Sequence, residues 1–160
     1  MRRTLAILLV LVAVTAAGIT PDDFDAVVDF DASIESIASL VRRGLYDQID
    51  VERYVVLQGT VASVQVFDPD ADTFQALVEL VSSEWEDLRS IRVDRIYVLV
   101  EGPDFAARFQ SSPAADAPGQ SARAPLVTPN SDLMVVGPFI GTAPSETDEE
   151  LAVIYAVKLR

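Results

Sequence analysis

Much of the chain after residue 53 alternates between apolar and polar residues, the pattern of strands that bury one face. From Val55 to Val61 every second residue falls on one face of a first predicted strand. Beyond Ala62 the apolar phase shifts to Val64 and Val66. Because a one-residue slip turns every side chain to the other face, the shift predicts a bulge or a sharp bend at Ala62 or the residue after it.

Four further segments show the same alternation. The second predicted strand has one apolar face from Phe74 to Leu80, the third spans residues 91–100 and the fourth spans residues 133–141. The last, from Leu151 to Leu159, alternates most regularly and is predicted as one continuous strand with every second residue on one face. The chain is therefore predicted to be mainly β (α+β), with five principal strands.

One amphipathic helix is predicted ahead of the strands, over residues 33–43. Its apolar residues recur at the i, i+3, i+4, i+7 spacing of a single helix face. Asp31 or Ser33 can cap its first amide groups, and Gly44 is suited to end it. The acidic stretch before the helix contains enough apolar residues for a short edge strand.

The segments between the strands complete the predicted organisation. Residues 104–110 are consistent with a short helix, and residues 111–131 form a loop rich in proline and alanine that has too few bulky apolar side chains to build a core. We therefore divide the chain into a leading segment, an acidic N-terminal segment with the helix (19–50) and a β domain (51–160).

The leading segment, residues 1–18, has the organisation of a signal peptide. Arg2 and Arg3 precede an apolar stretch from Leu5 to Val14, and small residues follow at 15–18. The chain is predicted to be exported, periplasmic or secreted, with retention of the segment as an anchor as the alternative. Since the chain has no cysteine, it is not predicted to be a lipoprotein.

The order of the strands resembles that of OB-fold barrels, including exported bacterial OB-fold proteins and the wider nucleic-acid-type OB families. A long first strand with a bend and a long excursion between the third and fourth strands are features of that layout. The resemblance implies a five-stranded barrel, here preceded by one helix, with a binding role; a small β sandwich or an α+β meander is the alternative. It is carried by VVLQGTVASV (55–64), FQALVEL (74–80), RIYVLVEG (95–102), DLMVVGPFIG (132–141) and LAVIYAVKL (151–159).

Composition narrows the predicted function. The chain carries 12 basic and 25 acidic residues, a net charge of −13, and loss of the leading segment would remove two of the basic residues. Such a surface repels phosphate, so neither nucleic acid nor an anionic membrane is expected as a partner. The chain has no histidine and no cysteine, which excludes Ser-His and Cys-His nucleophiles and the usual zinc sites. We therefore predict a non-catalytic extracytoplasmic binding or interaction module for an unknown protein or small ligand.

A first acidic group suggests an alternative function as a weak calcium-binding or other cation-binding protein. Asp68, Asp70, Asp72 and Glu79 fall at positions 1, 3, 5 and 12 of the EF-hand loop template. Thr73 replaces the glycine that the template requires at position 6, and the flanking segments are predicted strands instead of helices. The other interpretation is a hairpin loop in which the aspartates stabilise the turn.

A second acidic group lies between the fourth and fifth predicted strands. In an OB barrel the loop there flanks the ligand face together with the loop between the first two strands, so these residues are predicted to make that face negative. The residues are Glu146, Asp148, Glu149 and Glu150.

The aromatic residues provide the last candidates. Tyr97 and Tyr155 share the phase of apolar neighbours on their strands and are expected to face the core. Trp85, between Glu84 and Glu86, is predicted as a packing residue at the end of the second strand. A carboxylate-based enzyme is kept as a third function, although glycoside hydrolysis needs two acids that face each other across a cleft.

Overall fold

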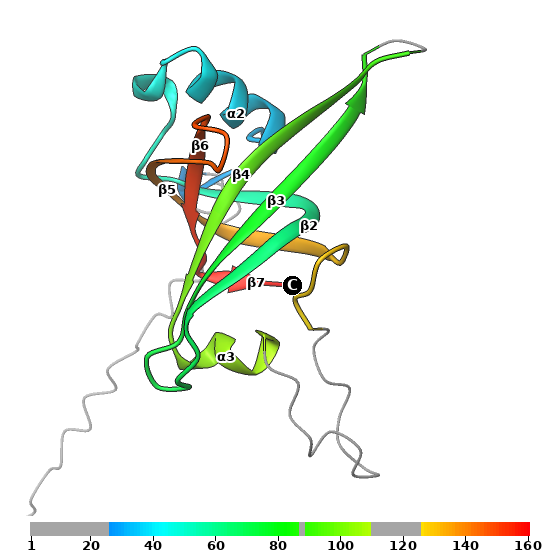
Figure 1. Cartoon of the computed structure of the whole chain (residues 1–160). Helices are drawn as coiled ribbons and strands as arrows, with labels where there is room; N and C mark the ends of the chain where they lie inside the picture. The colour runs from blue at the N-terminus through cyan, green and yellow to red at the C-terminus, as the bar shows by residue number, and fades with distance from the viewer. Residues whose placement is uncertain (1–25, 87–88, 110–125) are drawn as a thin grey trace, which may run out of the picture.

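The computed structural model describes residues 26–86, 89–109 and 126–160, so the predicted signal peptide and most of the proline- and alanine-rich loop lie outside the described residues. The described chain forms one sheet with three short helices around it (Figure 1). The strands are β1 (Val28–Asp29), β2 (Tyr54–Asp68), β3 (Gln75–Trp85), β4 (Ile91–Glu101), β5 (Asp132–Pro144), β6 (Glu150–Tyr155) and β7 (Lys158–Leu159), and the helices are α2 (Ile34–Arg42), η1 (Tyr46–Gln48) and α3 (Pro103–Phe109).

Five of the strands close into a barrel. β2 pairs with β3, β3 with β4, β4 with β6, β6 with β5, and β5 returns to β2. The long strand β2 serves both sides, since its first half pairs with β5 and its second half with β3. The register shifts between Val61 and Ser63, where the sequence predicts a bulge. The predicted OB-type barrel preceded by one helix is confirmed.

Apolar side chains fill the barrel and helices cover its two ends. Phe74, Val78 and Ile96 are at most 1% exposed, and burial of each such side chain contributes roughly 1.5–3 kcal/mol. α3 covers one end, where the rings of Phe74 and Phe109 lie 5.1 Å apart, and α2 lies near the other end (Figure 1). Among the described residues, no helix is both long enough and apolar enough to cross a bilayer.

Helix α2 begins and docks as its sequence predicts. The Ser33 hydroxyl accepts a hydrogen bond from the Ser36 amide, and the Ser36 hydroxyl accepts one from the Ser33 amide, so the two serines form a capping box. Gly44, at φ +69°, follows the C-terminal end. The side chain of Ile34 packs over Gly59 of β2, where an added Cβ would lie only 2.8 Å from the Ile34 Cδ1 atom.

The prediction of one continuous last strand is wrong. β6 ends at Tyr155, whose pairing with Leu99 is its last with β4, and β7 then pairs with β5. The prediction of a single buried face is only partly correct: Leu151 of that face is buried, but residues of the other phase are buried as well. Ala152 and Ile154 are fully buried inside the barrel, whereas Val157, predicted on the buried face, is 51% exposed.

Candidate functional site

The outer face of β3 and β4 is a two-stranded surface of low charge. Every second residue from Ala76 to Leu80 in β3 and from Ile96 to Val100 in β4 is buried in the barrel. The paired residues between them therefore point away from the interior, because side chains alternate between the two faces of a strand. Its charged members are Glu79, Arg95 and Glu101. The outward pairs are Gln75 with Glu101, Leu77 with Leu99, Glu79 with Tyr97, Val81 with Arg95, Ser83 with Val93, and Trp85 with Ile91.

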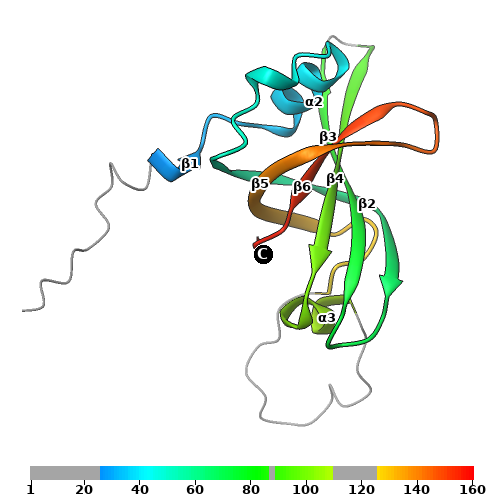
Figure 2. The same cartoon turned by 90° about the vertical axis from the view of Figure 1, so that its left-hand side faces the viewer.

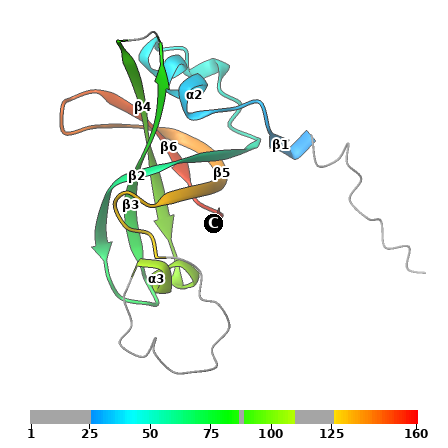
Figure 3. The same ribbon diagram turned by 90° about the vertical axis from the view of Figure 1, so that its right-hand side faces the viewer.

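A cleft of about 130 Å³ lies on this face, between the strands and the β5–β6 loop. Three strands and the loop contribute to it, so segments far apart in the sequence build one site. Figures 2 and 3 show the β5–β6 loop projecting on the side of the barrel away from β1. The lining residues are Ser63, Gln65, Leu77, Glu79, Arg95, Tyr97, Ser145, Glu146 and Thr147.

Arg95 is the cation of the cleft and is held by two carboxylates. Its Nη1 lies 3.3 Å from Glu79 Oε1, and its Nη2 donates to Glu149 and lies 3.4 Å from the Thr147 hydroxyl. The hydrogen bond to Glu149 raises the pKa of Arg95, and the charges of Glu149 and Glu79 add to that effect. Arg95 therefore ties the β5–β6 loop to the barrel and is already neutralised.

The β5–β6 loop is shaped by Ser145, which is 8% exposed. Its hydroxyl oxygen accepts hydrogen bonds from the Glu149 amide at 3.1 Å and the Thr147 amide at 3.3 Å. This turn places Glu146 in the wall of the cleft and Glu149 against Arg95. The other two predicted ligand-face residues are exposed: Asp148 lies on the loop and Glu150 is the first residue of β6.

Tyr97 lies on the floor of the cleft, so the prediction that it faces the core is wrong. The buried phase of β4 belongs to Ile96, Val98 and Val100, and Tyr97 stands on the outer face beside Glu79. Tyr155 is half-buried as well. Partial burial raises the pKa of the Tyr97 phenol, and the charge of Glu79 raises it further. The phenol therefore stays protonated at neutral pH and can donate a hydrogen bond to a ligand.

The hairpin of β3 and β4 extends beyond the barrel (Figure 1). The register of the two strands places an apolar strip on the same outer face. Trp85 is 67% exposed, and Ile91 and Val93 are 51% and 52% exposed. The predicted packing role of Trp85 is therefore wrong: its strand runs five residues past the predicted apolar face, into a part of the hairpin that leaves the barrel. An exposed aromatic beside two exposed aliphatic residues is a surface available for contact.

The other predicted acidic group, Asp68, Asp70 and Asp72, lies at the end of β2 and in the β2–β3 turn, near the α3 end of the barrel and apart from the β5–β6 loop (Figure 1). Asp68 accepts hydrogen bonds from the Asp70 amide at 2.9 Å and the Thr73 hydroxyl at 2.7 Å, and Asp70 accepts one from the Asp72 amide at 3.0 Å. The bond from Thr73 lowers the pKa of Asp68, followed by that from Asp70. In the described part of the chain no three or more acidic residues gather as a metal site requires. The calcium hypothesis stays a prediction.

The residues that sequence reasoning missed are Arg95 and Tyr97 as partners in one cleft. A signal was present: Tyr97 shares its phase with Arg95, whereas the other phase of β4 ends in three branched apolar residues. That asymmetry favours an outward Tyr97. The approach of the β5–β6 loop to Arg95 depends on barrel closure and has no local signal.

Comparison with known proteins finds likeness in structure alone. No protein-family model matches the chain, and no curated protein sequence does. Solved structures similar to it include a small single-stranded DNA-binding protein from Mycoplasma pneumoniae (12% identity, 67% of this chain and 90% of that one, TM-score 0.38). Others are a Plasmodium falciparum SSB complex with single-stranded DNA (12%, 67% and 89%, TM-score 0.40) and a small single-stranded DNA-binding protein from Streptomyces coelicolor (14%, 67% and 89%, TM-score 0.35).

These comparisons correct two predictions. Composition predicted a binding module of unknown ligand and excluded nucleic acid, whereas the similar solved structures are those of single-stranded DNA-binding proteins. The physical reason for the error is that net charge sums over the whole chain. The outer hairpin face carries only two carboxylates and one guanidinium among its outward pairs. The net charge of the chain therefore does not decide which ligands that face of the OB barrel accepts.

Proposed function

We propose that the barrel binds single-stranded nucleic acid along the outer face of β3 and β4, with the bases in contact with the protein. The observation that carries the proposal is the continuous outer surface that runs from the cleft at Tyr97 to the exposed Trp85. OB barrels use this face and the adjoining loops for oligonucleotides and oligosaccharides. Single strands are suited to it because their bases are free to stack on aromatic rings.

The surface has aromatic side chains for stacking at two positions along the hairpin. Tyr97 lies in the cleft with Leu77 beside it, and Trp85 lies farther along the hairpin with Ile91 opposite. Base–aromatic stacking contributes about 1–3 kcal/mol for each base, with little preference for sequence. Two platforms on one face therefore favour a short strand over an isolated nucleotide.

Charge sets the character of this binding. Arg95 is engaged by Glu79 and Glu149, and Glu146 adds a further carboxylate to the cleft wall. Phosphate contacts are thus disfavoured, so the affinity depends on the bases and has a shallow dependence on salt. Double-stranded nucleic acid, whose bases are not available for stacking, is excluded from this mode.

The fluorescence of Trp85 tests the proposal directly, because it is the single tryptophan of the chain. Titration of the full-length chain with oligothymidylate is expected to quench that fluorescence through stacking, and a duplex of equal length is expected to have no such effect. Tyr97→Ala, monitored by the same signal, is expected to weaken binding about tenfold, which corresponds to roughly 1.4 kcal/mol.

The matched control is Tyr46→Ala. Tyr46 is a 43% exposed tyrosine on η1, outside the proposed face, and its removal is expected to leave the affinity unchanged. Equal losses for the two variants, equal binding of the duplex, or binding of oligosaccharides in place of oligonucleotides would each contradict the proposal.

Two further properties remain proposals of the same kind. We infer binding without turnover, since Glu79 and Glu149 of the cleft are both engaged by Arg95. We also infer export, supported by the basic and apolar organisation of residues 1–18. Export predicts that protein recovered from outside the cytoplasm begins near residue 19, and N-terminal sequencing that finds Met1 in that fraction would contradict cleavage.

A further inference from the structure

A second concave site lies at the N-terminal side of the molecule, away from the cleft. It is a pocket of about 150 Å³ between the segment that precedes α2, one side of α2, the end of η1 with the residues that follow it, and the start of β2. Figures 2 and 3 place β1 and the β5–β6 loop on opposite sides of the barrel. The pocket is thus separate from the surface of the proposed function.

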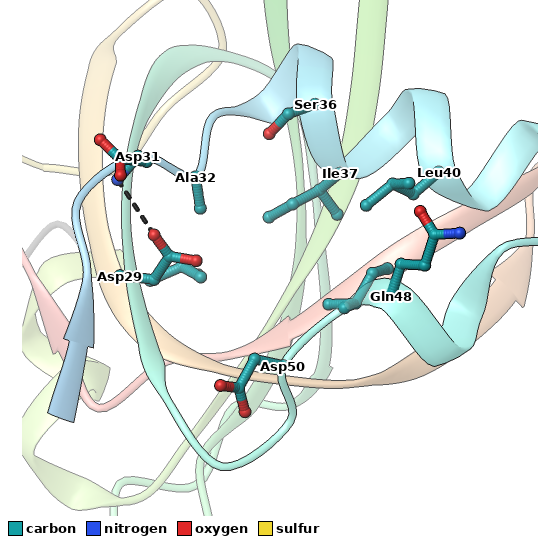
Figure 4. Close-up of a pocket in the computed structure, with 10 residues that line it drawn as sticks. Asp29, Asp31, Ala32, Ser36, Ile37, Leu40, Gln48 and Asp50 are labelled. Carbon is teal, nitrogen blue, oxygen red and sulfur yellow. Dashed lines mark hydrogen bonds between the residues drawn. The ribbon is translucent and has the colours of Figure 1, made fainter. Parts of the chain in front are cut away.

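The floor of the pocket is apolar. Ile37, Ile49 and Val55 are 3%, 8% and 3% exposed, and Leu40 of α2 adds to the wall. Figure 4 shows Ile37 and Leu40 across the pocket from the segment that carries Asp29 and Asp31. A cavity of about 150 Å³ with apolar walls is large enough to hold a benzene-sized group.

The rim carries three carboxylates, those of Asp29, Asp31 and Asp50. Asp29 Oδ1 accepts a hydrogen bond from the Asp31 amide at 3.0 Å (Figure 4), and Asp50 Oδ1 accepts one from the Glu52 amide at 3.0 Å. These bonds fix the orientation of two carboxylates. Arg53 Nη1 lies 4.0 Å from Asp29 Oδ2, at the limit of an ion pair, so the rim keeps a net negative charge.

Exposed apolar side chains belong to the same two rim segments. Phe30, between Asp29 and Asp31, is 55% exposed, and Val51, next to Asp50, is 58% exposed. Alternation of carboxylates with exposed apolar groups around an apolar pocket is complementary to a partner that carries both a positive charge and apolar surface.

We propose that this pocket docks a segment of a partner protein through an arginine or lysine side chain flanked by apolar residues. The aliphatic stem of the inserted side chain lies along Ile37, Ile49 and Val55, and its cationic head reaches the carboxylates at the rim, the arrangement that such amphipathic side chains adopt. Arginine is favoured over lysine, because its planar guanidinium can donate to two carboxylates at once. The flanking apolar residues contact Phe30 and Val51.

The test uses blocked tripeptides as probes and chemical-shift titration of the ¹⁵N-labelled full-length chain. Acetyl-Leu-Arg-Leu-amide is expected to shift the amides of Asp31, Gln48 and Asp50. The citrulline analogue, which has the same shape without the charge, is expected to bind at least tenfold more weakly. Acetyl-arginine-amide, which lacks the apolar flanks, is also expected to bind more weakly. The proposal would be overturned if the citrulline tripeptide or acetyl-arginine-amide bound as tightly as the arginine tripeptide.

Paired variants localise the site. Asp31→Asn with Asp50→Asn keeps the side-chain shapes at two exposed positions and is expected to reduce tripeptide binding at least tenfold. Asp70→Asn with Asp72→Asn, in the distant β2–β3 turn, removes the same charge and is expected to have no effect. Equal losses in both pairs, or none in the first pair when its melting temperature is that of the wild type, would contradict the proposal. The Asp31/Asp50 pair should keep its quenching by oligothymidylate, so the two proposals fail independently.

Discussion

The two concave sites of this barrel differ in how charge is combined with apolar surface. In the cleft the carboxylates of Glu79 and Glu149 are engaged by Arg95, so an apolar and aromatic strip dominates the face. At the N-terminal pocket three carboxylates surround an apolar floor, with Arg53 4.0 Å from one of them. One chain with a net charge of −13 therefore presents two different surfaces. What each surface can bind depends on whether its carboxylates are paired with arginine, more than on the net charge of the chain.

Asp94 connects the elements that carry the two sites. This carboxylate is 1% exposed, and its oxygens lie 2.7 Å from Arg42 Nη1 of α2 and 2.9 Å from Arg92 Nε of the hairpin. Loss of one partner of a buried ion pair costs about 3–5 kcal/mol. Since both arginine side chains are more than a third exposed, their charges can rehydrate. We therefore expect Asp94→Ala to reduce the free energy of unfolding by about 3 kcal/mol, measured by urea denaturation.

Glu84→Gln is the control for Asp94. Glu84 pairs with the same Arg92 at 2.8 Å but its side chain is 63% exposed, so its substitution should change stability by less than about 1 kcal/mol. Equal effects of the two substitutions would mean that burial of Asp94 adds nothing to the connection between α2 and the hairpin.

Gly59→Ala should affect binding at the two sites to different extents. An added Cβ would lie 2.8 Å from both Ile34 Cδ1 and the Val81 carbonyl oxygen, and overpacking of this kind costs roughly 1–3 kcal/mol. Ile34 Cδ1 is the end of a side chain and can move aside, whereas the Val81 carbonyl belongs to the backbone of β3. We therefore expect displacement of β3 and a larger loss of oligothymidylate binding than of tripeptide binding. Both are measured by titration below the melting temperature.

Gly44→Ala provides the comparison for Gly59. At Gly44 the backbone is left-handed, at φ +69°, and nothing lies within 4 Å of an added Cβ. Its substitution should cost about 1 kcal/mol through backbone strain alone. A change in binding selectivity equal to that of Gly59→Ala would contradict the role of the close approach between Gly59 and the backbone of β3.

Local patterns predicted the barrel well, because each local signal has a direct structural cause. The apolar phase from Phe74 to Leu80 is the buried face of β3, and the phase change after Val61 is the bulge of β2. Ser33 caps α2 and Gly44 follows it, as predicted. Each of these features depends on residues that are neighbours in the sequence.

The sites were harder to predict because they depend on contacts between distant segments. The cleft requires Arg95 to meet Glu149, 54 residues later in the chain, and the N-terminal pocket requires Ile37 of α2 to lie near Val55 of β2. Strand β4 is apolar in both phases toward its end, so the orientation of Tyr97 is indicated only by Arg95, two residues earlier in the same phase. Of the predicted ligand-face residues, Glu146 and Glu149 reach the cleft or its arginine, whereas Asp148 and Glu150 do not appear among the residues around it.

Glu149→Gln tests how the ion pair between Arg95 and Glu149 affects binding in the cleft. The substitution removes the carboxylate that accepts a hydrogen bond from Arg95 Nη2 and lowers the negative charge of the face. Arg95 then becomes available to a phosphate group. We expect oligothymidylate to bind about two- to fivefold more tightly and with a steeper dependence on salt, since each phosphate contact adds to that slope.

Glu150→Gln removes the same charge from the adjacent residue, which is exposed. We expect a smaller gain in oligothymidylate affinity and an unchanged salt dependence. If both variants behave alike, the gain reflects net charge, and the pairing of Arg95 with Glu149 has no particular role in the cleft.

The smallest effect concerns acid stability at the junction of α2 with β3. Ser82 donates a hydrogen bond to Glu35, and this bond lowers the pKa of Glu35 below its ordinary value of 4.5. A depressed carboxyl pKa stabilises the folded state at pH values above 4.5, and the contribution disappears as the pH falls through the folded-state pKa. Ser82→Ala should therefore lower stability by about 0.5 kcal/mol at neutral pH and by less near about pH 3. Ser83→Ala, at the adjacent exposed hydroxyl, should show no such pH-dependent difference in urea denaturation, and a Ser82→Ala deficit that stays constant down to about pH 3 would mean that the bond does not depend on ionised Glu35.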